Sequence, residues 1–98
     1  MILGHGLINM KVDYTVQIWK EDRQFVAQAM PIDVLSSGET VPAARAALDE
    51  AVQLFLETAR EAGTLQEVLE ECGYEIHEGS WRAPEWISVE RHSALLGA

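Results

Sequence analysis

The chain of 98 residues is poor in cysteine, in basic residues and in long apolar runs. Its single cysteine, Cys72, has no internal partner for a disulfide, which is typical of proteins in a reducing compartment. No apolar run approaches the roughly 18 to 20 residues that a membrane-spanning helix needs. Residues 1–9 lack the basic region and cleavage pattern of a signal peptide. We therefore expect a cytoplasmic protein with no membrane partner and, at this length, one domain with a modest core.

Basic residues are scarce relative to acidic ones. Seven Lys and Arg stand against sixteen Asp and Glu, which gives a formal net charge of −9. The excess is concentrated between Glu61 and Glu90, where eight glutamates accompany one arginine, Arg82. Proteins that bind nucleic acid usually gather Lys and Arg on one face, so no direct nucleic-acid partner is expected. An acidic surface attracts basic proteins or cations, and it can also serve solubility alone.

Signals for catalysis and for metal binding are also missing. Ser36 and Ser37 do not lie in a Gly-x-Ser-x-Gly elbow, and no glycine-rich phosphate loop is present. His5, His77 and His92 show no ligand spacing and have no partner cysteine cluster. The sequence therefore predicts no enzyme, no metal and no cofactor.

A degraded nuclease is the catalytic alternative to be weighed, because strands followed by a helix occur in two-metal nucleases. Such an enzyme needs carboxylates clustered at the central strand ends. The middle of the first predicted strand, Val16-Gln17-Ile18, has none, and Asp13, Asp22 and Asp33 fall at strand ends or connections, where aspartate is common. Metal-dependent RNA cleavage that is lost on changing Asp13 or Asp33 would be needed to support this alternative.

The sequence does contain a regular succession of strand patterns. Residues 13–20 and 25–30 alternate between apolar and polar side chains, and the polar link 21–24 between them predicts a hairpin. One face of each strand is apolar: Tyr14, Val16 and Ile18 on the first, Phe25, Ala27 and Ala29 on the second. A short third strand is predicted at 34–37, with Gly38 as a turn.

A long helix is predicted from Val41 to Ala62, with Thr40 as its N-cap. Its apolar side chains recur at helical spacing and form one stripe: Val41, Ala44, Leu48, Ala51, Val52, Phe55 and Ala59. Leu54 and Leu56 lie beside this stripe, so either the second helix or another subunit covers them. We expect a homo-oligomer, dimer or tetramer, with Leu54 and Leu56 at its interface.

The remaining third of the chain predicts smaller elements. A short helix begins at Thr64 with a capping box to Glu67 and ends at Gly73. A short strand is predicted at 74–78, and a last strand at 86–92 has Ile87 and Val89 on one face. The expected fold class is α+β: an antiparallel three- to four-stranded sheet, one long helix packed on one face and a short second helix. Residues 1–9 form an extension to a single domain at 10–98.

The chain resembles the HicB antitoxin family over nearly its whole length after Met10. The residues that carry the resemblance are Tyr14-Thr15-Val16, Ile18, Phe25-Val26-Ala27, Ser37-Gly38-Glu39-Thr40, Ala44 to Glu57, Gly63 to Tyr74 and Ile87 to His92. The resemblance implies a reduced ribonuclease-H-like layout of three antiparallel strands, a helix and a further strand, without catalytic acids. The chain departs from the family in its hairpin turn, which reads Glu21-Asp22-Arg23-Gln24. It also shows no sign of the C-terminal DNA-binding module that many family members carry.

Family members bind HicA, a small basic toxin that cleaves mRNA, and cover its active site. The resemblance therefore implies a non-enzymatic antitoxin that occludes a HicA-like toxin; in a departure from many family members, no DNA-binding module is expected here. The candidate partner-binding residues are Glu67, Glu70, Glu71, Glu75, Glu78, Trp81 and Trp86, with at least one of the two tryptophans expected to fill the edge of the core instead. A solitary scaffold or small-ligand-binding protein that has lost its toxin is the alternative.

Overall fold

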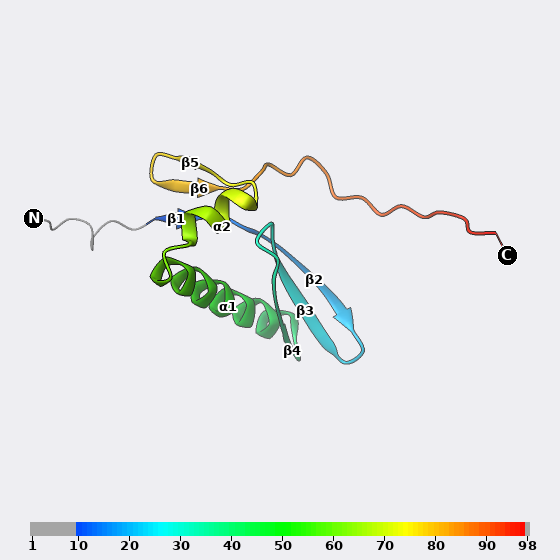
Figure 1. Ribbon diagram of the computed structural model, residues 1–98. Helices are drawn as coiled ribbons and strands as arrows, with labels where there is room; N and C mark the ends of the chain where they lie inside the picture. The colour runs from blue at the N-terminus through cyan, green and yellow to red at the C-terminus, as the bar shows by residue number, and fades with distance from the viewer. Residues whose placement is uncertain (1–9, 98) are drawn as a thin grey trace, which may run out of the picture.

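The computed structural model describes residues 10–97. Eight elements follow one another along the chain (Figure 1): β1 (Lys11–Val12), β2 (Thr15–Glu21), β3 (Gln24–Met30), β4 (Val34–Gly38), α1 (Val41–Glu61), α2 (Leu65–Glu71), β5 (Glu75–His77) and β6 (Ser80–Arg82). The predicted α+β class is confirmed, with a long and a short helix. The predicted extension, residues 1–9, lies outside the described residues.

The first sheet is antiparallel and has the order β2-β3-β4. The predicted hairpin is confirmed: Glu21 pairs with Gln24, so that Asp22 and Arg23 form a two-residue loop, and Asp22 has a φ of 54°. Aspartate tolerates this left-handed conformation better than most residues. On the inner face, Ala27 and Ala29 are completely buried, as their alternation predicts.

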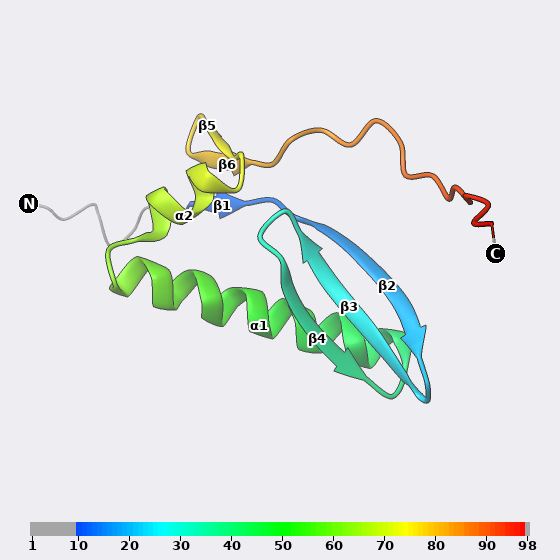
Figure 2. The same cartoon turned by 45° about the vertical axis from the view of Figure 1, so that its right-hand side comes forward.

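Helix α1 covers the inner face of this sheet, mainly beneath β3 and β4 (Figure 2). Its start is set by Thr40, whose hydroxyl oxygen accepts a hydrogen bond from the backbone N–H of Ala43 at 3.1 Å. Of the predicted stripe, Ala44, Leu48 and Val52 are buried in the core, whereas Ala51 and Phe55 are only partly buried and line a groove beside α2. The predicted N-cap, and a helix that ends within a residue of the predicted Ala62, are therefore confirmed.

A second sheet, which the sequence did not predict, has the order β1-β6-β5. β6 pairs in parallel with β1, opposing Val12 to Trp81, and antiparallel with β5. The loop between β5 and β6 consists of Glu78 and Gly79, both with positive φ (48° and 82°), as in a type I′ hairpin turn. The expectation of a single sheet of three to four strands is therefore corrected: three strands form one sheet and the others a second.

The predicted last strand, residues 86–92, is wrong for this chain by itself. Beyond Arg82 the backbone has no regular secondary structure and runs away from both sheets (Figures 1 and 2). A strand pattern needs a neighbouring strand to satisfy its backbone groups. No strand among residues 10–97 pairs with this segment, so its alternating residues do not form a strand.

Two local predictions are corrected as well. The capping box at Thr64 does not form, since the Thr64 hydroxyl donates to the carbonyl oxygen of Ala59 at 3.4 Å and caps no N–H of α2. Gly38 is the last residue of β4 and not a turn residue. Only glycine fits at position 38, because a Cβ there would lie 2.6 Å from the backbone nitrogen of Ala44 in the first turn of α1.

Candidate functional site

Five of the predicted partner-binding residues gather on one part of the surface. They lie on α2 and on the hairpin that follows it, and we call them the acidic face: Glu67, Glu70, Glu71, Glu75 and Glu78. Helix α2 turns Leu69 into the core and leaves its glutamates exposed. The β5–β6 hairpin lies beside α2 in both views (Figures 1 and 2), since Trp81 of β6 joins the same core cluster as Leu69.

The carboxylates of the acidic face are almost unpaired. Within residues 10–97, the ion pairs are His77 with Glu75 at 3.6 Å and His92 with Glu90 at 2.9 Å. None of the five glutamates pairs with a Lys or Arg of the part of the chain that the structure describes. Their negative charge is therefore left to water, or to a partner that brings cations.

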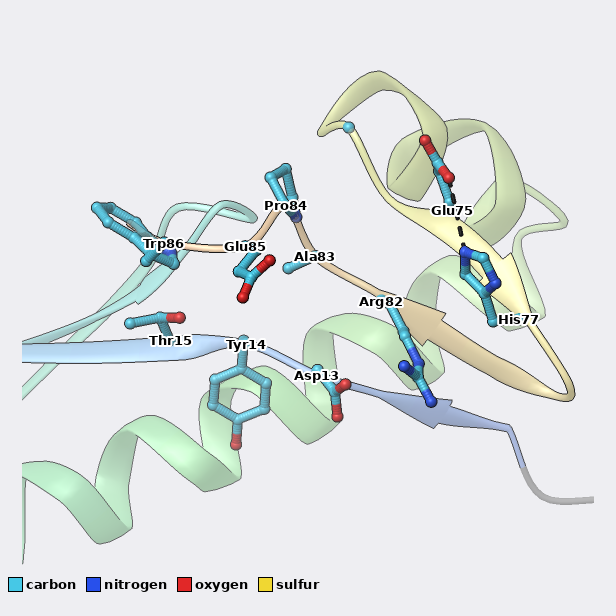
Figure 3. Close-up of a pocket in the computed structure, with 11 residues that line it drawn as sticks. Asp13, Tyr14, Thr15, Glu75, His77, Arg82, Ala83, Pro84, Glu85 and Trp86 are labelled. Carbon is cyan, nitrogen blue, oxygen red and sulfur yellow. Dashed lines mark ion pairs between the residues drawn. The ribbon is translucent and has the colours of Figure 1, made fainter. Parts of the chain in front are cut away.

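A hollow lies next to the acidic face, between the start of β2, the β5–β6 hairpin and the segment that leaves β6 (Figure 3). We call it the β6 hollow; its polar lining consists of Asp13, Thr15, Glu75, His77, Arg82 and Glu85, with Trp86 at one end. Three carboxylates, one guanidinium and one imidazole thus line one open depression. Such a lining suits a polar ligand or the side chains of a protein partner.

The two candidate tryptophans have different surroundings. Trp81 is only 6% exposed and belongs to the core, so the expectation that it contributes an exposed contact is wrong. Trp86 is 45% exposed and lines the β6 hollow. The expectation that at least one of them fills the core is confirmed, and Trp86 is the one that a partner can reach.

The side chains that could ligate a metal are dispersed. Within residues 10–97 no three His, Cys, Asp or Glu side chains are grouped as a metal site would require. His77 and His92 each contact a glutamate two residues away, on separate segments. Asp22 and Asp33 occupy turns with positive φ, the structural role that the sequence suggested for them.

The two predicted oligomer residues are also in different environments. Leu56 is partly buried against the core, whereas Leu54 is 66% exposed. Leu54 lines a mainly apolar groove along α1 and α2, together with Ala51, Phe55, Thr58, Ala59, Ala62, Thr64 and Val68. Of the two leucines, Leu54 is therefore the candidate for contact with another subunit.

Two tyrosine hydroxyls fix the start of β2 against the rest of the molecule. The hydroxyl of Tyr74 donates to the backbone carbonyl of Asp13 at 2.5 Å, and that of Tyr14 donates to Asp49 Oδ1 at 2.6 Å. Burial raises the pKa of both tyrosines to about 12, helped at Tyr14 by the hydrogen bond to Asp49 and its charge, and at Tyr74 by the charges of Cys72 and Asp13.

These shifts predict a loss of stability in alkali. In the unfolded chain a tyrosine ionises near pH 10, so the stabilising contribution is complete below pH 10 and is lost as the pH rises through about 12. We expect Tyr74→Phe to cost about 1 kcal/mol at pH 8, where it removes one hydrogen bond. We also expect the variant to lose less stability than the wild type between pH 10 and 12.

Urea unfolding at a series of pH values measures both effects. Tyr14→Phe is the second test, because Tyr14 has a similarly raised pKa and its removal should reduce the alkaline loss in the same way, while the Tyr74 hydrogen bond to Asp13 stays in place. Identical alkaline profiles for the wild type and both variants would contradict the assignment.

Several residues of the β6 hollow were not found from the sequence. The sequence assigns Asp13 to a strand end or, in the nuclease alternative, to a carboxylate site, and it includes Arg82 and Glu85 only in the acidic stretch from Glu61 to Glu90. The one available signal was the Glu78-Gly79 pair after a short strand, which predicts a returning strand at 80–82. The parallel pairing of β6 with β1, which brings β6 close to Asp13, could not be predicted, because β1 has only two residues and shows no strand pattern.

The comparisons with known proteins found no match for this chain. No family model, no curated protein and no solved structure matches the chain. Among the described residues, neither helix is long and apolar enough to cross a membrane.

Proposed function

We propose that the chain is a HicB-like antitoxin, a non-catalytic cytoplasmic module that binds a small basic HicA-like toxin and covers its RNA site. The observation that carries the proposal is the acidic face, whose glutamates find no Lys or Arg partner within residues 10–97. The order strand, strand, strand, helix between β2 and α1 supports the HicB-like, reduced ribonuclease-H-like layout.

The mechanism is steric occlusion aided by charge. A toxin that cleaves mRNA presents cations where RNA phosphates bind, and the glutamates of α2 and the β5–β6 hairpin would occupy the same positions. Opposite charges also steer the two proteins together and speed their association. Trp86 provides an accessible aromatic side chain beside this face, the type that most often anchors protein interfaces. In this mechanism the chain binds no nucleic acid itself.

The test is recovery of a partner on the tagged protein from its own cells. We expect a small basic protein to co-purify at low salt and to be released at high salt, since salt screens exposed charges. Glu70→Lys with Glu71→Lys should weaken the complex at least tenfold, which corresponds to about 1.4 kcal/mol.

The control carries the same change of charge elsewhere. Glu39 and Glu50 are exposed at the start and in the first half of α1, away from the acidic face. Glu39→Lys with Glu50→Lys should leave binding nearly unchanged. A preparation with no partner, or equal weakening by both pairs, would contradict the proposal.

A second candidate function, an orphan scaffold that binds a small ligand, is favoured by the β6 hollow. Arg82 and His77 line it together with three carboxylates and Trp86, a combination that suits a zwitterionic ligand with an apolar part. If no toxin is recovered, small zwitterionic ligands should raise the melting temperature of the wild type and not that of Arg82→Ala. We also infer a homo-oligomer, dimer or tetramer; in a tetramer, the exposed Leu54 is the residue that contacts a further subunit.

A further inference from the structure

The segment after β6 is the part of the chain with the least protection from water. Ile87 and Val89 are 88% and 75% exposed, and Leu95 and Leu96 are fully exposed. The segment runs away from both sheets as an extended chain (Figures 1 and 2). Ile87 and Val89 belong to an alternating strand pattern, so their exposure indicates a missing neighbour.

The side chains of this segment already lie as in a strand. Ser88 Oγ donates to Glu90 Oε2 at 2.7 Å, and His92 Nε2 lies 2.9 Å from Glu90 Oε1. Contacts between side chains two residues apart are typical of an extended backbone, in which alternate side chains share one side. Ser88, Glu90 and His92 therefore form a polar side, and Ile87 and Val89 point to the other.

A suitable acceptor is the outer edge of β2. β2 pairs only with β3, so its opposite side presents unpaired backbone groups. Val16 and Ile18 face the core, yet both remain partly exposed, because α1 lies mainly beneath β3 and β4. The sheet thus lacks cover at this edge, on the side where a further apolar strand would complete the core.

The segment and the edge match in length and in pattern. Residues 86–92 and Thr15–Glu21 both contain seven residues. Aligned side by side, Ile87 and Val89 would extend the apolar face of Val16 and Ile18, while the polar side would continue the outer face of β2. Within one chain, Trp86 lies beside Thr15, where β2 begins (Figure 3), and the residues after it lead away from that strand.

We propose that the segment from Trp86 to His92 pairs as an added strand with the free edge of β2 in a second copy of the chain. The reciprocal exchange gives a closed, symmetric dimer in which both segments and both edges are covered. The dimer does not require the proposed toxin: Trp86 lies at the boundary of the two surfaces, and the glutamates of the acidic face lie outside the exchanged strand. Added salt reduces the repulsion between two copies of charge −9 and should not dissociate it, in contrast to the toxin complex.

The first test is sedimentation equilibrium over a range of concentrations. Ile87→Asn with Val89→Asn should raise the dissociation constant of the dimer by roughly a hundredfold, because two apolar side chains lose their burial. Leu95→Asn with Leu96→Asn is the matched control, with the same kind of change in the same segment outside the proposed strand, and should leave the dimer intact. A wild type that stays monomeric would overturn the proposal, as would a dimer that Leu54→Asn dissociates and Ile87→Asn with Val89→Asn does not.

The second test identifies the partner strand directly. In a Cys72→Ser background, one tagged copy carries Gln17→Cys and a differently tagged copy carries Ser88→Cys. Mild oxidation should join the two tags, because both positions lie on the outer face in the exchanged dimer. No joining of the tags, together with an internal disulfide in a chain that carries both changes, would show that the segment folds back on its own β2 and would overturn the proposal.

Discussion

Replacing Trp81 by alanine is expected to lower the free energy of unfolding by about 4 kcal/mol, the largest loss predicted for a residue of the candidate site. The indole is buried among Leu69, Tyr74 and the other residues of the core cluster, in the strand that joins β1 to β5. Alanine leaves a cavity that a small domain cannot fill. The second sheet and the acidic face that rests on it should therefore loosen together.

Trp86→Ala is the matched control for this variant. Trp86 is 45% exposed and lies beyond the last strand, so its truncation should cost less than about 1 kcal/mol. In the antitoxin proposal, Trp86→Ala weakens partner binding with unfolding unchanged, whereas Trp81→Ala weakens binding only as far as it unfolds the protein. Chemical denaturation and binding measured on both variants separate the two roles. Equal stability of the two variants would contradict the assignment of Trp81 to the core.

Replacing Gly38 by alanine is the second change with a large expected effect, a loss of about 3 kcal/mol. Its added Cβ would lie 2.6 Å from the nitrogen of Ala44 and 2.8 Å from the carbonyl carbon of Ala43, both backbone atoms of the first helical turn. Neither atom can move without displacing α1 from β4. The clash should thus weaken the contact that holds the long helix on the sheet.

Thermal or urea unfolding measures this loss directly. Glu39→Ala, one residue further on and exposed, is the control and should change stability by less than about 0.5 kcal/mol. An unchanged stability of Gly38→Ala would mean that β4 and α1 are further apart than the structure places them. Gly38→Ser should behave like alanine, because the obstacle is the Cβ itself.

The polar residues of the candidate site could be predicted only in part. The glutamates of α2 stand out in sequence as a charge excess, and their exposure follows from Leu65 and Leu69 taking the inner side of the helix. The β6 hollow depends on Asp13 and Arg82 lying near each other, which no local pattern predicts. Trp81 is a single large apolar residue between the polar Ser80 and Arg82. Such a short stretch shows no alternation of apolar and polar residues from which its burial could be predicted.

The strands of the β2–β3–β4 sheet, the long helix and the Thr40 cap could be predicted from local patterns of residues. In these elements the alternation and the helical spacing act over a few residues, and short links bring neighbours together. The second sheet, the burial of Trp81 and the unpaired state of residues 86–92 became visible only in the folded chain. These features depend on contacts between residues far apart in the chain: the Tyr74 hydroxyl donates to the carbonyl of Asp13 across 61 positions, and a two-residue strand such as β1 forms only where the core supplies its partner.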